Sequence, residues 1–244
     1  MCTADLKFSP DGAHLAASSS DKFIDVFDMA AKGADAAAGA GWFTKVGQCA
    51  GHSSSVKHLD WSCDGKYIRS TCGSYELLFW DMPSGAQVKK AVGLREQVWA
   101  TNSVTLGWDV KGVWEEGADG TDVNCCALST VPGRSDPSSF IDSATGVRGP
   151  VPEDKIACLP ADGGPPLLAT SDDYGQVKLF QYPVVVDQSE SVTLPGHSSH
   201  VMAVTFAAGD SAVLSAGGLD MAAIAWRMGD PATFPTADAS DGWQ

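Results

Sequence analysis

The residues best suited to chemistry are two histidines, His52 and His197, each of which follows a glycine and precedes two serines. Imidazole binds metals and moves protons near neutral pH, so both positions invite a catalytic or metal-binding interpretation. His197 and His200 also form a His-x-x-His pair. No cysteine or further histidine stands close in sequence to complete a zinc site, so we expect no metal here.

Four carboxylates gather in a glycine-rich stretch: Glu115, Glu116, Asp119 and Asp122. Carboxylate oxygens are calcium ligands, but their spacing does not match a helix-loop-helix calcium loop. We expect a solvated acidic turn in which Asp119 or Asp122 accepts hydrogen bonds from backbone donors.

Motifs of catalysis are missing from the sequence. It has no Gly-x-Ser-x-Gly, no phosphate-cradling loop and no His-Glu-x-x-His. We therefore predict a protein that is not an enzyme and needs no cofactor. Three tryptophans of the middle segment are predicted to pack in a core or to line a concave face between blades: Trp99, Trp108 and Trp114.

The two histidines belong to a repeat. Gly51-His52 leads to Trp80-Asp81, and Gly196-His197 leads to Trp226, with 28 and 29 residues from histidine to tryptophan. A repeated Gly-His to Trp-Asp unit is typical of one four-stranded blade of a β-propeller. Val-x-x-Val-x-Phe patterns ahead of a turn predict the inner strand of each unit, and Asp64-Gly65 predicts a tight hairpin.

Further units follow from the same register. Strands are expected at 6–8, 14–17 and 23–28, closed by Phe27 in place of tryptophan, and at 167–170 and 176–180, closed by Phe180. Four blade signatures are legible. A fifth segment, 98–114, has strand-like runs without a turn signature.

The predicted fold is all-β: an incomplete WD-repeat β-propeller of about four to five four-stranded blades over residues 1–228. The expected blades span 4–46, 47–91, 92–118 (irregular), 119–187 and 190–228, and a polar tail spans 229–244. Residues 30–41 and 132–166 are predicted to be surface loops. Because a ring of this type usually needs about seven blades of roughly 40 residues, we expect an open arc with two uncovered edges, or one capped by its own loops.

The repeated histidines are predicted to be structural. In such a blade the histidine bonds an acid of the second hairpin and a hydroxyl of the middle strand, and the chain of bonds ends at the tryptophan indole. Counting back from each closing aromatic gives no complete set: the unit closed by Trp226 lacks the hydroxyl, and the unit closed by Trp80 lacks the acid. The candidate network residues are His52, Ser70, Trp80, His197, Asp220, Trp226, Asp21 and Thr170.

Charge and composition exclude several classes. The net charge is −14, from 16 Lys and Arg against 30 Asp and Glu, which disfavours nucleic acid and anionic membrane surfaces as partners. No apolar run approaches the length of a membrane span, and the start lacks the features of a secretion signal. Seven cysteines without a Cys-x-x-Cys pair favour reduced, mostly buried thiols; adjacent Cys125 and Cys126 should point to opposite faces of a strand.

Three stretches carry a resemblance: 52–62, 112–124 with its Gly-Ala-Asp-Gly-Thr-Asp segment, and 168–183 followed by 196–201. In this order they resemble the C-terminal propeller of the echinoderm microtubule-associated protein-like family, over about 5–227. The resemblance implies a non-enzymatic scaffold of the cytoplasmic cytoskeleton that contributes to tubulin or microtubule association.

Family members usually also carry a first propeller, a coiled coil and a basic region. None of these is in this sequence, which is best interpreted as a fragment or a truncated relative. Because tubulin surfaces are also acidic, a chain of charge −14 gains nothing from long-range attraction. The alternative function is a general protein-interaction platform with a non-cytoskeletal partner.

Overall fold

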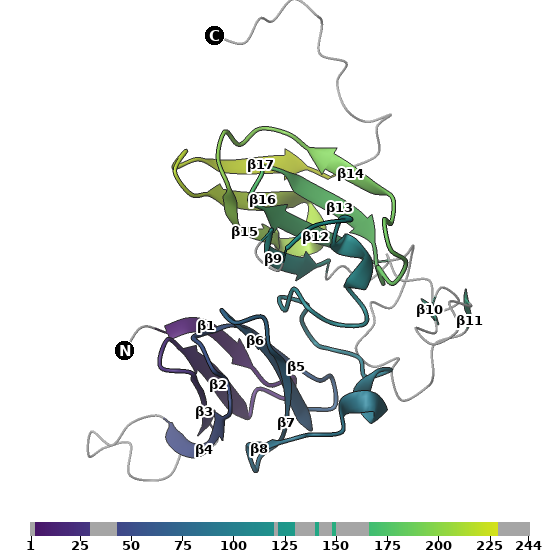
Figure 1. The fold of residues 1–244 in the computed structure, drawn as a ribbon. Helices are drawn as coiled ribbons and strands as arrows, with labels where there is room; N and C mark the ends of the chain where they lie inside the picture. The colour runs from purple at the N-terminus through teal and green to yellow at the C-terminus, as the bar shows by residue number, and fades with distance from the viewer. Residues whose placement is uncertain are drawn as a thin grey trace, which may run out of the picture.

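Four antiparallel sheets form the blades of a β-propeller in the computed structural model, which describes residues 3–29, 43–119, 122–129, 140–141, 148–149 and 166–228 (Figure 1). The all-β propeller predicted from the repeat is thus confirmed. The predicted loop at 30–41, most of the one at 132–166, and the tail at 229–244 lie outside the described residues.

The first two blades each have four strands in sequence order. Blade 1 contains β1 (Thr3–Phe8), β2 (His14–Ser19), β3 (Phe23–Asp28) and β4 (Thr44–Ala50). Blade 2 contains β5 (Val56–Trp61), β6 (Tyr67–Cys72), β7 (Leu77–Asp81) and β8 (Ala86–Gln87). The hairpin between β5 and β6 turns at Gly65, whose φ of +69° is a conformation that glycine adopts without steric cost.

Blade 3 is assembled across the long insertion. Its order is β9 (Val123–Leu128), β12 (Leu167–Asp172), β13 (Val177–Gln181) and β14 (Ser191–Leu194), while β10 (Phe140–Ile141) and β11 (Arg148–Gly149) pair separately. Blade 4 contains three described strands: β15 (Val201–Phe206), β16 (Ala212–Gly217) and β17 (Ala223–Arg227).

The segment 92–118 forms no blade, so the structure has the lower of the two expected blade numbers. The 3₁₀ helix η2 (Ala91–Leu94) leads into it, it contains the 3₁₀ helix η3 (Lys111–Val113), and one isolated β-bridge joins Trp99 to Ser62. The interpretation of the runs at 98–114 as strand-like was therefore wrong. Their apolar residues pack instead: Trp99 is buried beside Phe79 and Leu94, and Trp108 stacks on Phe79 with 5.7 Å between ring centroids.

Apolar side chains between neighbouring sheets make the cores. Blades 1 and 2 share one cluster: Ala16, Ile24, Val26, Cys49, Val56, Leu59, Trp61, Ile68 and Trp80. Blades 3 and 4 share another: Ala169, Val177, Val201, Val204 and Val213. Val56, Leu59 and Trp61 of β5 and Val201 and Val204 of β15 are buried, as the Val-x-x-Val-x-Phe pattern predicted for the large apolar residues of the inner strands.

The outer face of blade 1 is less covered. Leu6 and Phe8 are 55% and 59% exposed. Leu6 and Phe8 alternate along β1 with Asp5, whose carboxylate accepts a hydrogen bond from Leu59 N of blade 2. Leu6 and Phe8 therefore lie on the side of the sheet away from blade 2.

The second hairpin of every blade turns at the same end of the sheets. These hairpin tips are 20–22, 73–76, 173–176 and 218–222, and the segments 51–55 and 197–200 lie beside them because they enter the inner strands at that end. We call this end of the molecule the hairpin face. His52, His197 and Asp220 lie at this end of the sheets.

The cysteines depart from expectation at one position. Cys49, Cys72, Cys125 and Cys126 are free, but Cys63 is disulfide-bonded, so the expectation of reduced thiols fails there. Cys125 and Cys126 do pack into two different apolar clusters, as residues that alternate along a strand should. Among the described residues, no helix has the length and apolar character needed to cross a bilayer.

Candidate functional site

His52 lies at the centre of the hydrogen-bond chain in blade 2. Its Nε2 atom is 2.7 Å from Ser70 Oγ, and the Trp80 indole donates to the same oxygen at 2.8 Å. All three residues are buried. The structure therefore brings together the three candidates that sequence counting assigned to this blade.

An acid that the sequence counting missed completes this group. Glu76 Oε2 lies 3.5 Å from His52 Nδ1 and accepts a hydrogen bond from Ser53 N at 2.8 Å. The expectation that this blade lacks an acid was wrong. The count tested only the sixth position before Trp80, whereas a glutamate four positions before it is long enough to reach the histidine.

His197 occupies the equivalent place in blade 4. Its Nδ1 is 2.7 Å from Asp220 Oδ2 and its Nε2 is 2.6 Å from Ser215 Oγ. Ser198 N also donates to Asp220 Oδ2, at 3.2 Å. The Trp226 ring lies against the imidazole, with 5.9 Å between centroids.

Ser215 supplies the hydroxyl that this blade was expected to lack. Ser70 pairs with Leu78 and Ser215 pairs with Ile224, and each closing tryptophan follows its paired residue by two positions. The β16–β17 hairpin is one residue longer, so a fixed count of ten from Trp226 falls on Ala216. Strand register places the hydroxyl where residue counting could not.

The Ser215–His197–Asp220 chain has the order of a hydrolytic triad, but its surroundings oppose that chemistry. A nucleophile must reach its substrate, whereas Ser215 is 5% exposed in the middle strand of a blade. The hydroxyl at the same strand position in blade 2, Ser70, is fully buried. Burial therefore favours a structural hydrogen-bonding role for the hydroxyl groups of Ser70 and Ser215.

The two remaining candidates lie apart from these networks. Asp21 sits at the tip of the β2–β3 hairpin, and its buried Oδ1 has no hydrogen-bond partner among the described residues. Thr170 is buried in β12, opposite Cys126 and Lys178. No histidine of the described part of blades 1 and 3 is joined to either.

Both histidine networks tie a hairpin tip to the neighbouring entry loop. Glu76 bonds Ser53, and Asp220 bonds His197 and Ser198, so the tips at 73–76 and 218–222 are fixed from beneath. Those tips carry exposed apolar side chains on the hairpin face, and blade 3 adds one more. Their exposed fractions are 50% for Tyr75, 68% for Tyr174, 81% for Leu219 and 90% for Met221.

A buried ion network that the sequence did not indicate explains the irregular segment. Arg69 Nε donates to Asp60 at 3.1 Å, and its Nη1 donates to both oxygens of Asp109, at 2.8 and 3.0 Å. Its Nη2 donates to Asn102, and the guanidinium lies 4.7 Å from the centre of the Trp99 ring. The segment 98–114 therefore surrounds the side chain of Arg69 and supplies most of its partners.

Asp60 anchors the same segment through its carboxylate. It accepts hydrogen bonds from Thr101 Oγ1 at 2.6 Å, Ser103 N at 2.9 Å and Val104 N at 3.1 Å. Burial by itself raises the pKa of Asp60, but Arg69 and these donors together hold it below its ordinary value.

The network extends into blade 3. Tyr182 donates to Asp109 at 3.0 Å, and His58 Nε2 lies 3.0 Å from the carbonyl of Asn124. These contacts join blade 2 to blade 3 through polar groups, whereas blades 1 and 2 share an apolar cluster besides their hydrogen bonds.

The described residues of the acidic stretch, 115–119 and 122, also lie at the hairpin face. Asp122 Oδ2 accepts from the backbone of Asp119 at 3.0 Å, the role expected of a short acid in a turn. Glu115 pairs with Lys178, and Tyr174 donates to Asp122 at 3.3 Å. Glu115, Asp122, Tyr174 and Lys178 are among the residues that line a cavity of about 150 Å³.

Comparisons with known proteins agree with this architecture. The family described as "Echinoderm microtubule-associated protein second beta-propeller" matches residues 2–135. The chain is 36% identical over 223 residues to the 77 kDa echinoderm microtubule-associated protein of Strongylocentrotus purpuratus. It is 36% identical over 223 residues to echinoderm microtubule-associated protein-like 2 of Homo sapiens. Each alignment covers 91% of this chain.

The relatives are much longer. The aligned part is 27% of the sea urchin protein and 28% of the human one, so the chain spans little more than a quarter of each.

Proposed function

The chain belongs to the echinoderm microtubule-associated protein family, and from that premise we propose that it is a non-enzymatic scaffold that contributes to tubulin or microtubule association. The observation that carries the proposal is similarity over 91% of the chain to proteins named for microtubule association. A cytoskeletal location in the cytoplasm follows from the same proposal.

The hairpin face is the surface that we propose for the contact. Tyr75, Tyr174, Leu219 and Met221 stand exposed at the tips of adjacent blades, and exposed aromatic and methionine side chains are enriched at protein interfaces. The histidine networks beneath hold two of these tips in place. Pre-organised loops bind with less loss of conformational entropy, which supports a binding role for a rigid face.

Charge sets the expected strength of binding. A net charge of −14 gives no long-range attraction to an acidic partner, so contact must come from a local patch. We therefore expect weak binding by this chain alone, and binding that does not fall when salt is raised, because salt screens the repulsion.

The test is co-sedimentation of the purified chain with taxol-stabilised microtubules at low and moderate salt. A Tyr75→Ser, Tyr174→Ser double variant should lose pelleting. The matched control is Val186→Ser, which changes a 65% exposed apolar side chain in the β13–β14 connection, at the opposite end of the sheets. Absence of wild-type pelleting at both salt concentrations would refute direct microtubule association.

A general protein-interaction platform is the second candidate, favoured by the same exposed side chains, which suit other protein partners equally. A pull-down that recovers non-cytoskeletal proteins through the hairpin face, without tubulin, would favour it over the first proposal.

A further inference from the structure

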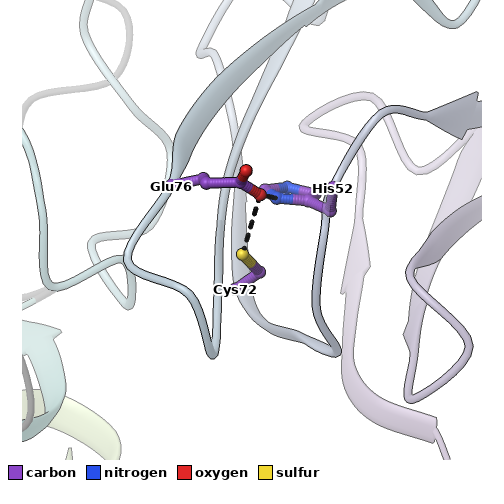
Figure 2. A group of neighbouring side chains, drawn as sticks. All are labelled: His52, Cys72 and Glu76. Atoms are coloured by element: carbon purple, nitrogen blue, oxygen red, sulfur yellow. Dashed lines mark hydrogen bonds and ion pairs between the residues drawn. The ribbon is translucent and has the colours of Figure 1, made fainter.

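Three different metal-binding side chains converge at the hairpin face of blade 2. The possible ligand atoms of His52, Cys72 and Glu76 all lie within 4.8 Å of one another (Figure 2). They come from the entry loop, the end of β6 and the β6–β7 hairpin, so the fold itself brings them together.

His52 contributes a nitrogen, Nδ1, that makes no hydrogen bond to the described residues. Its side chain is 0% exposed, yet Nδ1 makes no hydrogen bond within the described structure, and the nearest carboxylate oxygen, of Glu76, is 3.5 Å away. At the equivalent position in blade 4, His197 Nδ1 lies 2.7 Å from Asp220. Burying an unpaired polar atom is costly, so the longer separation in blade 2 points to a missing partner.

A thiol distinguishes this site from its counterpart. Cys72 Sγ is 3.1 Å from Glu76 Oε2 and accepts a hydrogen bond from Ser74 N at 3.4 Å. The residue at the same strand position in blade 4 is Gly217, where even a Cβ would lie 1.8 Å from an oxygen of Asp220. Blade 4 therefore closes its network with a direct histidine–acid hydrogen bond, whereas blade 2 holds its acid farther from the histidine and adds a sulfur donor.

We propose that His52 Nδ1, Cys72 Sγ and the Glu76 carboxylate form a binding site for a zinc-like divalent transition-metal ion. Metal–ligand bonds of about 2.0–2.3 Å in a tetrahedron separate neighbouring ligands by roughly 3.3–3.6 Å. The 3.5 Å and 3.1 Å separations here are close to those values. The mixed nitrogen, sulfur and oxygen donors favour zinc or cobalt over calcium or magnesium.

Metal binding at this site requires the loss of one proton. Cys72 releases its thiol proton to solvent on binding, and the His52 proton resides on Nε2, where Ser70 Oγ accepts it at 2.7 Å. Ser70 can accept from both His52 and Trp80 because a hydroxyl oxygen has two lone pairs. The blade network thereby orients the ligand, as outer hydrogen bonds commonly do for metal-bound histidine. The Glu76 side chain is 34% exposed, so the fourth position faces solvent.

The experiment uses the full chain, stripped with a chelator and titrated with cobalt(II). We expect one equivalent to bind with thiolate-to-cobalt charge-transfer absorption, and zinc to displace it. Cys72→Ala should abolish that absorption, and Cys72→Ala and Glu76→Gln should each weaken zinc binding at least about tenfold, the loss typical of outer partners alone. Cys49→Ala, at another buried free thiol, should change neither result.

Thermal unfolding separates a lost ligand from a lost fold. Zinc should raise the melting temperature of the wild-type chain and of Cys49→Ala but not of Cys72→Ala or Cys72→Ser, because only proteins with a native site are stabilised by the ion. Absence of a cobalt–thiolate band in the wild-type chain would overturn the proposal. So would a band, or zinc stabilisation, that persists in folded Cys72→Ala. Microtubule pelleting is a separate readout, so its failure leaves this result unchanged.

Discussion

Replacing Arg69 with methionine tests whether the irregular segment is held by buried charge. Arg69 is 1% exposed and bonds the fully buried Asp60, the partly buried Asp109, and Asn102. The variant leaves Asp60 as an unpaired buried carboxylate. Breaking a buried ion pair on one side typically costs about 3–5 kcal/mol. At about 2–4 °C per kcal/mol for a chain of this size, the melting temperature should fall by roughly 6–20 °C.

The assay is urea and thermal unfolding followed by circular dichroism. The control is Lys66→Met in the same blade, whose ion pair with Asp64 is 3.5 Å long between side chains that are 70% and 37% exposed. Exposed pairs contribute about 0–1 kcal/mol, so this variant should unfold near the wild type. A third variant, Arg69→Met with Asp60→Asn and Asp109→Asn, should recover part of the loss because no unpaired charge remains.

The stability cost of Arg69→Met should depend on pH. The pKa of Asp60 is lowered in the folded chain, so its contribution to stability is present above the unfolded value of 3.8 and is lost as pH falls through the folded value. The difference between wild type and Arg69→Met should therefore shrink below about pH 4. A cost of Arg69→Met no larger than that of Lys66→Met at pH 7 would refute the reasoning.

Three further predictions concern the blades. Ser70→Ala should destabilise the chain by about 1–3 kcal/mol because it removes the hydrogen bonds of two buried groups, His52 Nε2 and the Trp80 indole. Ser215→Ala should cost less, because its network is less buried and His197 stays hydrogen-bonded to Asp220; urea unfolding measures both variants, and equal costs would contradict this prediction. Burial lowers the pKa of His52 in the folded chain, so the stability contributed by neutral His52 should be full above the unfolded pKa of 6.5 and should decline as pH falls from 6.5 toward the folded pKa. A His52→Gln variant should therefore lose less stability than the wild type between pH 7 and pH 5, measured by urea unfolding. An equal loss in the two proteins would contradict this prediction. Gly85→Ala should cost more than Gly65→Ala in thermal unfolding, although both have φ of +69°, because a Cβ at 85 meets a backbone oxygen at 2.9 Å and one at 65 meets nothing within 4 Å; equal melting temperatures would contradict the close approach.

Sequence pattern was sufficient for the inner strands and their hairpins because the signal for each lies within a few residues, but it was not sufficient for the segment 98–114 or for the outer strands. One strand holds three buried apolar residues, Val56, Leu59 and Trp61, and Gly65 lies in the turn that follows. Such information lies within a few residues, so reading the chain in register recovers it.

The polar contacts could not be predicted from the sequence pattern alone. Arg69 meets Asn102 and Asp109 across 33 and 40 residues of chain, and no periodicity connects them. Glu76 and Ser215 were missed because residue counting assumed hairpins and side chains of constant length. Strand pairing, which depends on the three-dimensional register, is what places them beside His52 and His197.

Hydroxyl-radical footprinting of the chain with and without microtubules tests the central claim most directly, because it reports the exposure of single side chains. Tyr75, Tyr174 and Met221 should be protected on the hairpin face, while Phe8, which is 59% exposed at the opposite end of its blade, should oxidise at an unchanged rate. Unchanged oxidation of all three, or protection of Phe8 alone, would contradict a scaffold that contacts microtubules through its hairpin tips.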